Sequence, residues 1–198
     1  MKGSTRMGLC LGITGFGLCY LYDFNTVLWH KKWLQMFFLL GNLFIITGSL
    51  CILIPAWISM HIHVRFFVSA FFSVLFLMLL IYTLFFAIPF DTTYIHENTL
   101  RNAYTDGVYA LCRHPAVLWF TGLYFSLWLM VLTAEAAITF LLYILMDILY
   151  IILQERFIFF KTFKNYSEYQ MNTPFLIPTI SSIKKCVHTM TKGHHNTI

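Results

Sequence analysis

Charged residues are scarce in this chain: they make up 11% of its 198 residues, whereas hydrophobic residues make up 59%. A soluble domain is closer to half apolar and a quarter charged, because it must hide its apolar surface from water. The scarcity of charge therefore excludes an ordinary soluble domain and predicts that the lipid bilayer is the solvent. The 21 Phe and 11 Tyr residues suit lipid-facing helices and aromatic belts at the membrane surface.

Patterns of metal ligands and of paired cysteines are also missing. The five cysteines are scattered and lie mostly in apolar runs, with no C-x-x-C pair; they are Cys10, Cys19, Cys51, Cys112 and Cys186. We expect buried or tail thiols, with neither a zinc site nor a disulfide framework. His61 and His63 have no third ligand nearby in the sequence, so no metal site is predicted. No nucleic-acid motif accompanies the net charge of +5, and we attribute this charge to membrane topology and anionic headgroups.

Long apolar runs dominate what is present. A hydrocarbon core of about 30 Å needs about 20 residues of apolar helix. Five runs are candidates, at residues 7–22, 33–54, 66–89, 115–132 and 136–153. We therefore predict an all-α, polytopic integral membrane protein with about five transmembrane helices, forming a single domain over residues 1–198. The polar, basic stretch 180–198 is expected to be a flexible tail.

The first apolar run is short and carries four glycines between residues 8 and 17. Small residues at this spacing allow helices to approach closely. The alternative is a cleaved signal peptide led by Lys2 and Arg6. The run ends in Tyr-Leu-Tyr-Asp at residues 20–23, which lacks the small residues of a cleavage site and favours a retained helix.

The Lys and Arg residues are distributed unequally between the two sides of the predicted membrane helices. The N-terminus, the 55–65 loop and the 133–135 turn share one side and carry three of the 13. The 23–32 loop, the 90–114 segment and the tail carry the other ten. The positive-inside rule therefore predicts an N-terminus outside and a C-terminus in the cytoplasm.

Residues that could bind a ligand or take part in catalysis precede the fourth apolar run, in the order Cys112-Arg113-His114-Pro115. Proline suits the first position of a helix, because the N–H that it lacks would be unpaired there. This places His114 near the N-cap, where free backbone N–H groups and the helix dipole favour an anion.

The fourth and fifth runs form a helical hairpin that returns the chain to the same face. Each run is about 18 residues and would rise about 27 Å, with a tight reversal at Thr133-Ala134-Glu135. Gln154 and Glu155 should therefore end near the depth of His114. We predict that these residues meet at one cytoplasmic pocket.

Further residues follow these in a fixed order. The set is Gly107, Val108, Tyr109, Arg113, His114, Pro115, Glu155, Phe163, Tyr166, Tyr169, Pro174 and Pro178. This order resembles the C-terminal signature of the isoprenylcysteine carboxyl methyltransferase and phospholipid N-methyltransferase superfamily, over roughly residues 80–178. The resemblance implies a helical membrane enzyme that binds S-adenosylmethionine at the cytosolic ends of its last helices.

Four positions depart from the pattern of that superfamily. Val117 replaces a Tyr, Trp119 replaces a frequent Gly, and Gln154 replaces the first member of a Glu pair. Ile151 stands where prenylcysteine methyltransferases tend to carry an Arg that contacts the substrate. The resemblance therefore leaves the acceptor, and the atom that receives the methyl group, open.

The resemblance and the chemistry of the cofactor imply roles for individual residues. Arg113 and His114 are the catalytic candidates. The expected cofactor-binding residues are Arg101, Tyr109, His114, Pro115, Ala116, Val117 and Glu155. The start of the fourth helix would hold the cofactor carboxylate, Glu155 would accept hydrogen bonds from its ammonium group or ribose, and Tyr109 would line the adenosine pocket.

Asp147 lies deep in the fifth run, where a carboxylate is costly and usually faces a partner or a cavity. It is expected either to contact a Thr or Tyr or to line the cavity of a lipophilic substrate, such as a prenylated molecule or a lipid. Two other functions stay open. One is an NADPH-dependent enzyme of the sterol-reductase kind, although no basic residues are placed to hold a 2′-phosphate. The other is a non-catalytic relative that binds a lipid or a partner.

Overall fold

The computed structural model describes residues 2–58, 64–88 and 102–193, and within these ranges the chain is all-α, as predicted. The long helices are α1 (Lys2–Phe24), α2 (Met36–Ile58), α3 (Val64–Phe85), α6 (Pro115–Val131) and α7 (Ala134–Leu153). The shorter ones are the π-helix η1 (Asn25–Trp29), the 3-10 helix η2 (Lys32–Gln35), α5 (Val108–Leu111), the π-helix η3 (Gln154–Phe159), α8 (Phe160–Thr162), α9 (Tyr166–Asn172) and α10 (Ile180–Gly193).

The long helices are apolar in the way that a bilayer requires. Within the described ranges, four helical segments are long and apolar enough to cross a membrane: Gly3–Trp29, Lys32–Ile58, Val64–Phe85 and Ala134–Thr162. Large apolar side chains on them face outward, as in Leu39 and Phe71. The chain is therefore an integral membrane protein. The fifth predicted span is the shorter helix α6, whose 17 residues rise about 25 Å.

The chain divides into two compact units that alternate along the sequence. Unit 1 comprises residues 1–75 and 121–158, and unit 2 comprises residues 76–120 and 159–198. Helices α3 and α6 contribute to both units, because the divisions fall inside them. Each unit has its own packing, and the single domain over residues 1–198 stays a prediction.

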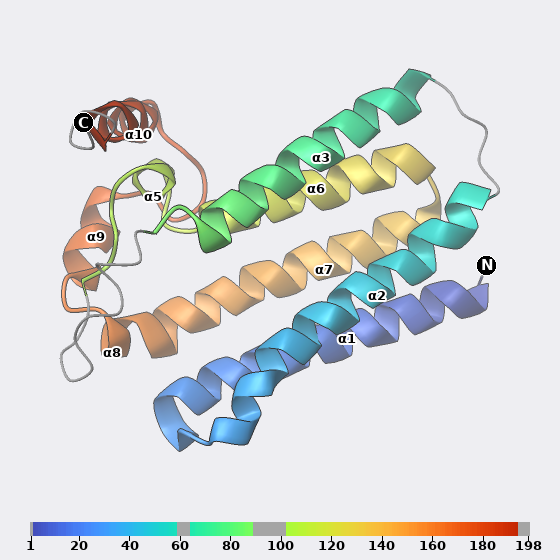
Figure 1. The fold of residues 1–198 in the computed structure, drawn as a ribbon, viewed down its shortest axis with the longest axis horizontal. Helices are drawn as coiled ribbons and strands as arrows, with labels where there is room; N and C mark the ends of the chain where they lie inside the picture. The colour runs from blue at the N-terminus through green and yellow to red at the C-terminus, as the bar shows by residue number, and fades with distance from the viewer. Residues whose placement is uncertain (1, 59–63, 89–101, 194–198) are drawn as a thin grey trace. The chain divides into compact units, whose positions relative to one another are not determined.

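In unit 1, helices α1 and α2 lie side by side and antiparallel (Figure 1), and glycines set their separation. A Cβ atom on Gly8 would lie 2.6 Å from the carbonyl oxygen of Gly48, and one on Gly15 would lie 2.6 Å from that of Gly41. Only glycine allows two backbones to come this close. The close approach predicted from the glycine-rich first run is therefore present.

Tyr143 of α7 lies at the centre of unit 1. Its side chain is 0% exposed, and its hydroxyl donates to the carbonyl oxygen of Gly8 at 2.6 Å. Its ring meets the rings of Phe16 and Tyr124 edge-on. The Tyr124 hydroxyl shares a hydrogen bond of 2.8 Å with the hydroxyl of Ser49. These contacts join α1, α2, α7 and the second half of α6 into one core.

The reversal between α6 and α7 is tight. Two residues separate the helices, and Leu132 has a φ of 48°, which turns the chain within that short distance. Thr133 caps α7, since its side chain accepts a hydrogen bond from the N–H of Ala136 at 3.3 Å. A tight reversal is present as predicted, but Leu132 and Thr133 form it, and Ala134 and Glu135 already belong to the first turn of α7.

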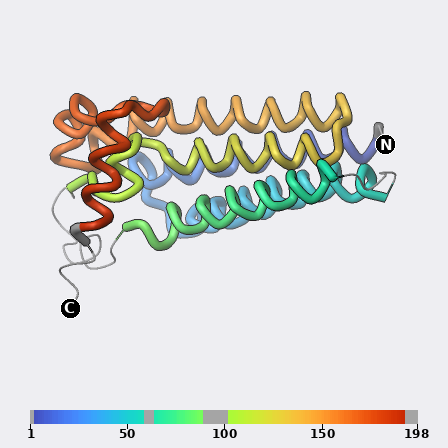
Figure 2. The backbone as a smooth tube through the Cα atoms, turned by 90° about the horizontal axis from the view of Figure 1, so that it is seen from above, coloured from blue at the N-terminus to red at the C-terminus, as the bar shows by residue number. Residues whose placement is uncertain are grey.

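Unit 2 gathers the short helices α5, α8, α9 and α10 with the end of α3 and the start of α6 (Figure 2). The indole N–H of Trp119 donates to the hydroxyl of Thr83 at 2.9 Å, and the ring of Phe76 stacks on Trp119. These contacts connect α3 to α6. The expected flexible tail, residues 180–198, contains α10, a helix that the sequence analysis did not predict.

Candidate functional site

The Arg-His-Pro motif lies at the start of α6, as expected. Cys112 is extended, with φ −159° and ψ 167°, so the chain straightens after α5 before Pro115 opens α6. Cys112 is fully buried, and its sulfur accepts a hydrogen bond from the backbone N–H of His114. Burial raises the pKa of the Cys112 thiol to about 11, so this group stays protonated at neutral pH.

Arg113 contacts residues 170–175 and links them to the start of α6. Its backbone N–H donates to the carbonyl oxygen of Pro174 at 2.9 Å, and its Nη1 donates to that of Gln170 at 2.9 Å. Its guanidinium carbon lies 5.4 Å from the centre of the Phe175 ring. These contacts give Arg113 a structural task within unit 2, while its catalytic role stays a prediction.

His114 is enclosed by two aromatic rings. Its side chain is 6% exposed. Its ring is nearly parallel to that of Phe159, with 5.9 Å between centroids, and edge-on to that of Phe175 at 5.1 Å. Pro115, Ala116 and Val117 form the first turn of α6, and Val117 is buried. Pro115 has no N–H, and the N–H of Val117 donates to the carbonyl oxygen of His114 at 3.2 Å, so the helix dipole is the main feature that suits this end of α6 to an anion.

Tyr109 and Tyr169 connect α5 to its neighbours in unit 2. The hydroxyl of Tyr169 donates to the carbonyl oxygen of Tyr109 at 2.7 Å. The hydroxyl of Tyr109 donates to the carbonyl oxygen of Thr83 at 3.2 Å. Burial raises the pKa of Tyr109 to about 12, so it remains a neutral donor in the physiological range. The hydroxyl of Tyr109 is thus occupied by a hydrogen bond to α3. The predicted contact of this residue with adenosine would therefore use its ring.

Thr173 adds a polar group that sequence reasoning missed. Its side chain is 3% exposed, and among the described residues its Oγ1 has no hydrogen-bond partner. It precedes Pro174, which is bonded to Arg113, so it lies close to the start of α6. A buried hydroxyl without a partner is costly, and a bound ligand or an ordered water is a common reason for one. No sequence pattern distinguishes Thr173 from the other threonines.

Glu155 belongs to unit 1, in the π-helix η3 that continues α7. Its side chain is 9% exposed. A π-helical turn shifts the residues that follow it, and such turns are frequent at functional sites. His114 belongs to unit 2. The predicted pocket shared by Glu155 and His114 therefore draws on both units and stays a prediction.

Gln154, where the superfamily carries a Glu, is bonded to a carboxylate of α1. Its Nε2 donates to Oδ2 of Asp23 at 2.7 Å. Asp23 is buried and also forms a side-chain hydrogen bond with Tyr150. A carboxylate thus lies beside position 154, but α1 supplies it. Asp23 was not predicted from the sequence, because its contact with Gln154 joins distant segments of the chain.

Asp147 lies in unit 1 on α7, one turn beyond Tyr143. Cys19 and Tyr20 of α1, Tyr124 of α6 and Tyr150 of α7 lie within range of an electrostatic interaction with Asp147. Asp147 is therefore near aromatic and thiol groups of neighbouring helices, and its side chain is half-buried.

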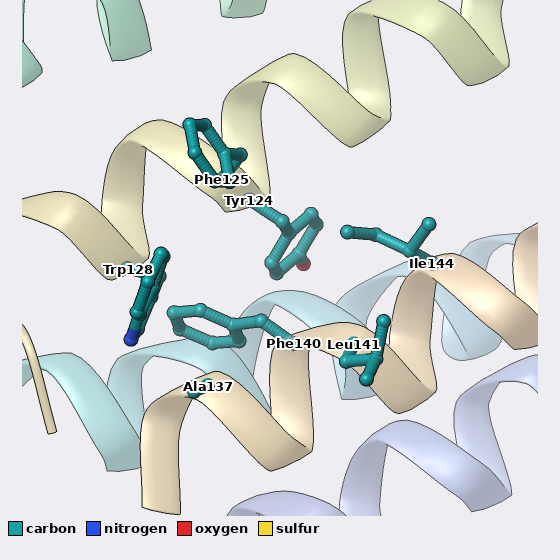
Figure 3. A pocket seen from close by; sticks show the side chains of 7 residues that line it. All are labelled: Tyr124, Phe125, Trp128, Ala137, Phe140, Leu141 and Ile144. Atoms are coloured by element: carbon teal, nitrogen blue, oxygen red, sulfur yellow. The ribbon is translucent and has the colours of Figure 1, made fainter. Parts of the chain in front are cut away.

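A hollow of about 190 Å³ lies between α6 and α7 in unit 1 (Figure 3). The side chains that line it are those of Tyr124, Phe125, Trp128, Ala137, Phe140, Leu141 and Ile144. The wall is almost entirely apolar, which suits hydrocarbon. Asp147 is not among the lining residues, so this hollow does not supply the substrate role that was predicted for it.

Some predicted residues have no described position. Arg101, His61 and His63 lie outside the described residues. In the part of the chain that is described, no group of three or more His, Cys, Asp and Glu side chains is arranged to hold a metal ion.

Comparisons of the chain with protein-family models, with curated proteins and with solved structures gave no match. The superfamily resemblance therefore depends on the order and spacing of residues in this sequence. What the structure adds is the set of contacts among those residues within each unit.

Proposed function

We propose that this protein is an integral membrane methyltransferase that uses S-adenosylmethionine and acts on a lipophilic acceptor. The observation that carries the proposal is the arrangement of unit 2. Residues from two separate stretches of the motif region lie together there: Tyr109 with Tyr169, and Arg113 with the Gln170–Phe175 stretch. His114 lies buried among these segments, against Phe159 and Phe175.

The residues present fit the chemical groups of this cofactor. Its carboxylate suits the start of α6, where the helix dipole attracts an anion. Its sulfonium and adenine suit aromatic rings, which Phe159 and Phe175 provide beside His114. Its ammonium and ribose hydroxyls suit a carboxylate, the role that the sequence resemblance predicts for Glu155. The buried hydroxyl of Thr173 is a further hydrogen-bonding group for a ligand.

S-adenosylmethionine, when bound, supplies an electrophilic methyl group on a sulfonium centre. The task of the protein is then to align the acceptor with that group and to exclude water, because alignment contributes most to an in-line displacement. The burial of His114 provides a water-poor position at the start of α6. A carboxylate or thiolate acceptor would need no general base, whereas an amine would have to be neutral.

The membrane environment and the apolar hollow of unit 1 support a lipophilic acceptor. The apolar hollow between α6 and α7 is suited to a hydrocarbon chain and to little else (Figure 3). The excess of Lys and Arg on one set of loops supports a cytoplasmic position for the motif and the C-terminus, where the cofactor would be available.

Direct binding tests the cofactor assignment. The full-length protein in detergent micelles would be titrated calorimetrically with S-adenosylmethionine and, in parallel, with NADPH. We expect saturable micromolar binding of S-adenosylmethionine. Glu155→Gln and His114→Ala should each weaken it at least about tenfold, because a hydrogen bond to a charged group contributes about 1.5–3 kcal/mol.

The control variant is Arg156→Gln, which alters the exposed neighbour of Glu155 and should leave the affinity unchanged. Unchanged affinity in folded Glu155→Gln and His114→Ala proteins would disprove the pocket. Binding of NADPH alone would support the reductase-like alternative. Binding of neither ligand would support a non-catalytic relative that binds a lipid or a partner.

Thr173→Val separates a ligand-binding hydroxyl from a structural one. Valine keeps the shape of threonine and removes the buried hydroxyl, so the ligand-free protein should become more stable by about 1 kcal/mol. If the hydroxyl serves the ligand, the same variant should bind S-adenosylmethionine several-fold more weakly. Thermal unfolding and calorimetry on the same preparation give both quantities. A variant that is less stable and binds normally would contradict this role.

A further inference from the structure

Helix α10 has three distinct faces. One face contacts α5 and is built from small side chains: Ser182, Cys186 and Thr189, spaced four and three residues apart. Ser182 and Cys186 are buried, and the hydroxyl of Thr189 accepts a hydrogen bond from the N–H of Gly107 at 3.0 Å. This face fixes α10 to unit 2.

A second face of α10 is apolar and exposed. Ile180, Ile183, Val187 and Met190 follow one another at spacings of three, four and three residues, which places them on one stripe of an α-helix. Ile180 is 76% exposed and Val187 is 58% exposed. Within the described residues nothing covers this stripe, although an apolar stripe of this kind normally faces a core or a membrane.

The third face of α10 is basic. Lys184, Lys185 and His188 lie on it, and residues 180–193 contain no Asp or Glu. At about 100° per residue, Lys184 lies next to the apolar stripe, while Lys185 lies nearly opposite. An apolar stripe beside a basic face is the pattern of a helix that lies in the surface of an anionic bilayer.

The position of α10 in unit 2 brings it to that surface. The Gly107–Thr189 hydrogen bond holds it beside the residues just before Pro115, where the apolar helix α6 begins. Both views of the fold show α10 running across the direction of the last turns of α3 and the first turn of α6, which belong to the same unit (Figure 1, Figure 2). A helix held across the end of membrane helices would lie along the bilayer surface.

We propose that α10 is a membrane-surface helix whose apolar stripe enters the acyl region of an anionic leaflet, while Lys184 beside the stripe contacts the headgroups and the remaining basic charge is attracted to the leaflet from a greater distance. The charge of its basic face is complementary to anionic lipid and would not favour a basic partner. This interaction is independent of any cofactor. The interaction would hold α10, which packs on α5, at the lipid surface near the Arg113-His114-Pro115 motif.

Photo-crosslinking tests this interaction in the full-length protein. The photoreactive residue p-benzoylphenylalanine would replace Val187 on the apolar stripe or, as a matched control, Lys185 on the opposite face. The protein would be reconstituted into vesicles of phosphatidylcholine with phosphatidylserine. Illumination should give lipid adducts at position 187 and few at position 185, as read by mass spectrometry of the C-terminal peptide.

The charge of the helix gives a second test. With the crosslinker at 187, Lys184→Glu with Lys185→Glu should lower the adduct yield roughly threefold or more in vesicles that contain phosphatidylserine, and much less in pure phosphatidylcholine. Lys161→Glu with Lys164→Glu changes the net charge equally outside α10 and should have little effect on that yield. Adducts between two copies of the chain or with another protein at position 187, or equal lipid adducts at 185 and 187, would overturn the proposal.

Discussion

Replacing Gly12 with alanine is expected to lower the free energy of unfolding by about 3 kcal/mol. A Cβ atom at this position would lie 2.1 Å from the Cε1, Cζ and hydroxyl oxygen atoms of Tyr143. The ring cannot move away cheaply, because it is fully buried and its hydroxyl is bonded to Gly8. Overpacking of this kind costs about 1–3 kcal/mol, and a lost hydrogen bond adds about 0.5–1.5 kcal/mol.

Gly17→Ala is the matched control, since it makes the same chemical change in the same helix. No heavy atom lies within 4 Å of a Cβ placed on Gly17, so we expect a change of less than about 1 kcal/mol. Equilibrium unfolding in mixed detergent micelles, followed by helical circular dichroism, measures both variants. Equal stabilities of the two would contradict the packing of α1 against α7.

Hydropathy predicted the membrane helices well because a bilayer requires long apolar segments whose backbone groups are satisfied internally. Hydropathy predicted the first and last residues of these helices less accurately. The first run was placed at residues 7–22, whereas α1 extends over Lys2–Phe24. Polar residues at the ends of that run continue the helix, because backbone hydrogen bonds do not depend on the hydropathy of the side chains.

The candidate site was predicted only where its residues are close in sequence or share a motif. Arg113, His114 and Pro115 lie at the start of α6 as expected. Asp23 and Thr173 were missed, because their importance comes from contacts with distant segments and from burial. Helix α10 was missed for another reason: its three-and-four spacing of apolar residues was present in the sequence, but its low overall hydropathy resembles that of a mobile tail.

Gln154→Glu, which introduces the residue of the superfamily, is expected to destabilise the protein by at least about 2 kcal/mol. The Gln154 amide now donates to Asp23 at 2.7 Å, so the substitution would bring two carboxylates together where a donor is required. A buried carboxylate that meets a like charge loses its hydrogen bond and cannot recover its hydration. Unfolding in mixed micelles would measure the loss.

Asp23→Asn in the Gln154→Glu protein should recover most of that stability, because the pair is then reversed: the Asn amide donates and the Glu carboxylate accepts. Asp23→Asn alone should have a small effect, since two amides can still form a hydrogen bond. The double-mutant cycle should thus give a coupling of at least about 1.5 kcal/mol. Affinity for S-adenosylmethionine, measured on the same four proteins, would reveal whether the pair also positions Glu155. If the changes in stability were additive, Asp23 would not determine which amino acid is tolerated at position 154.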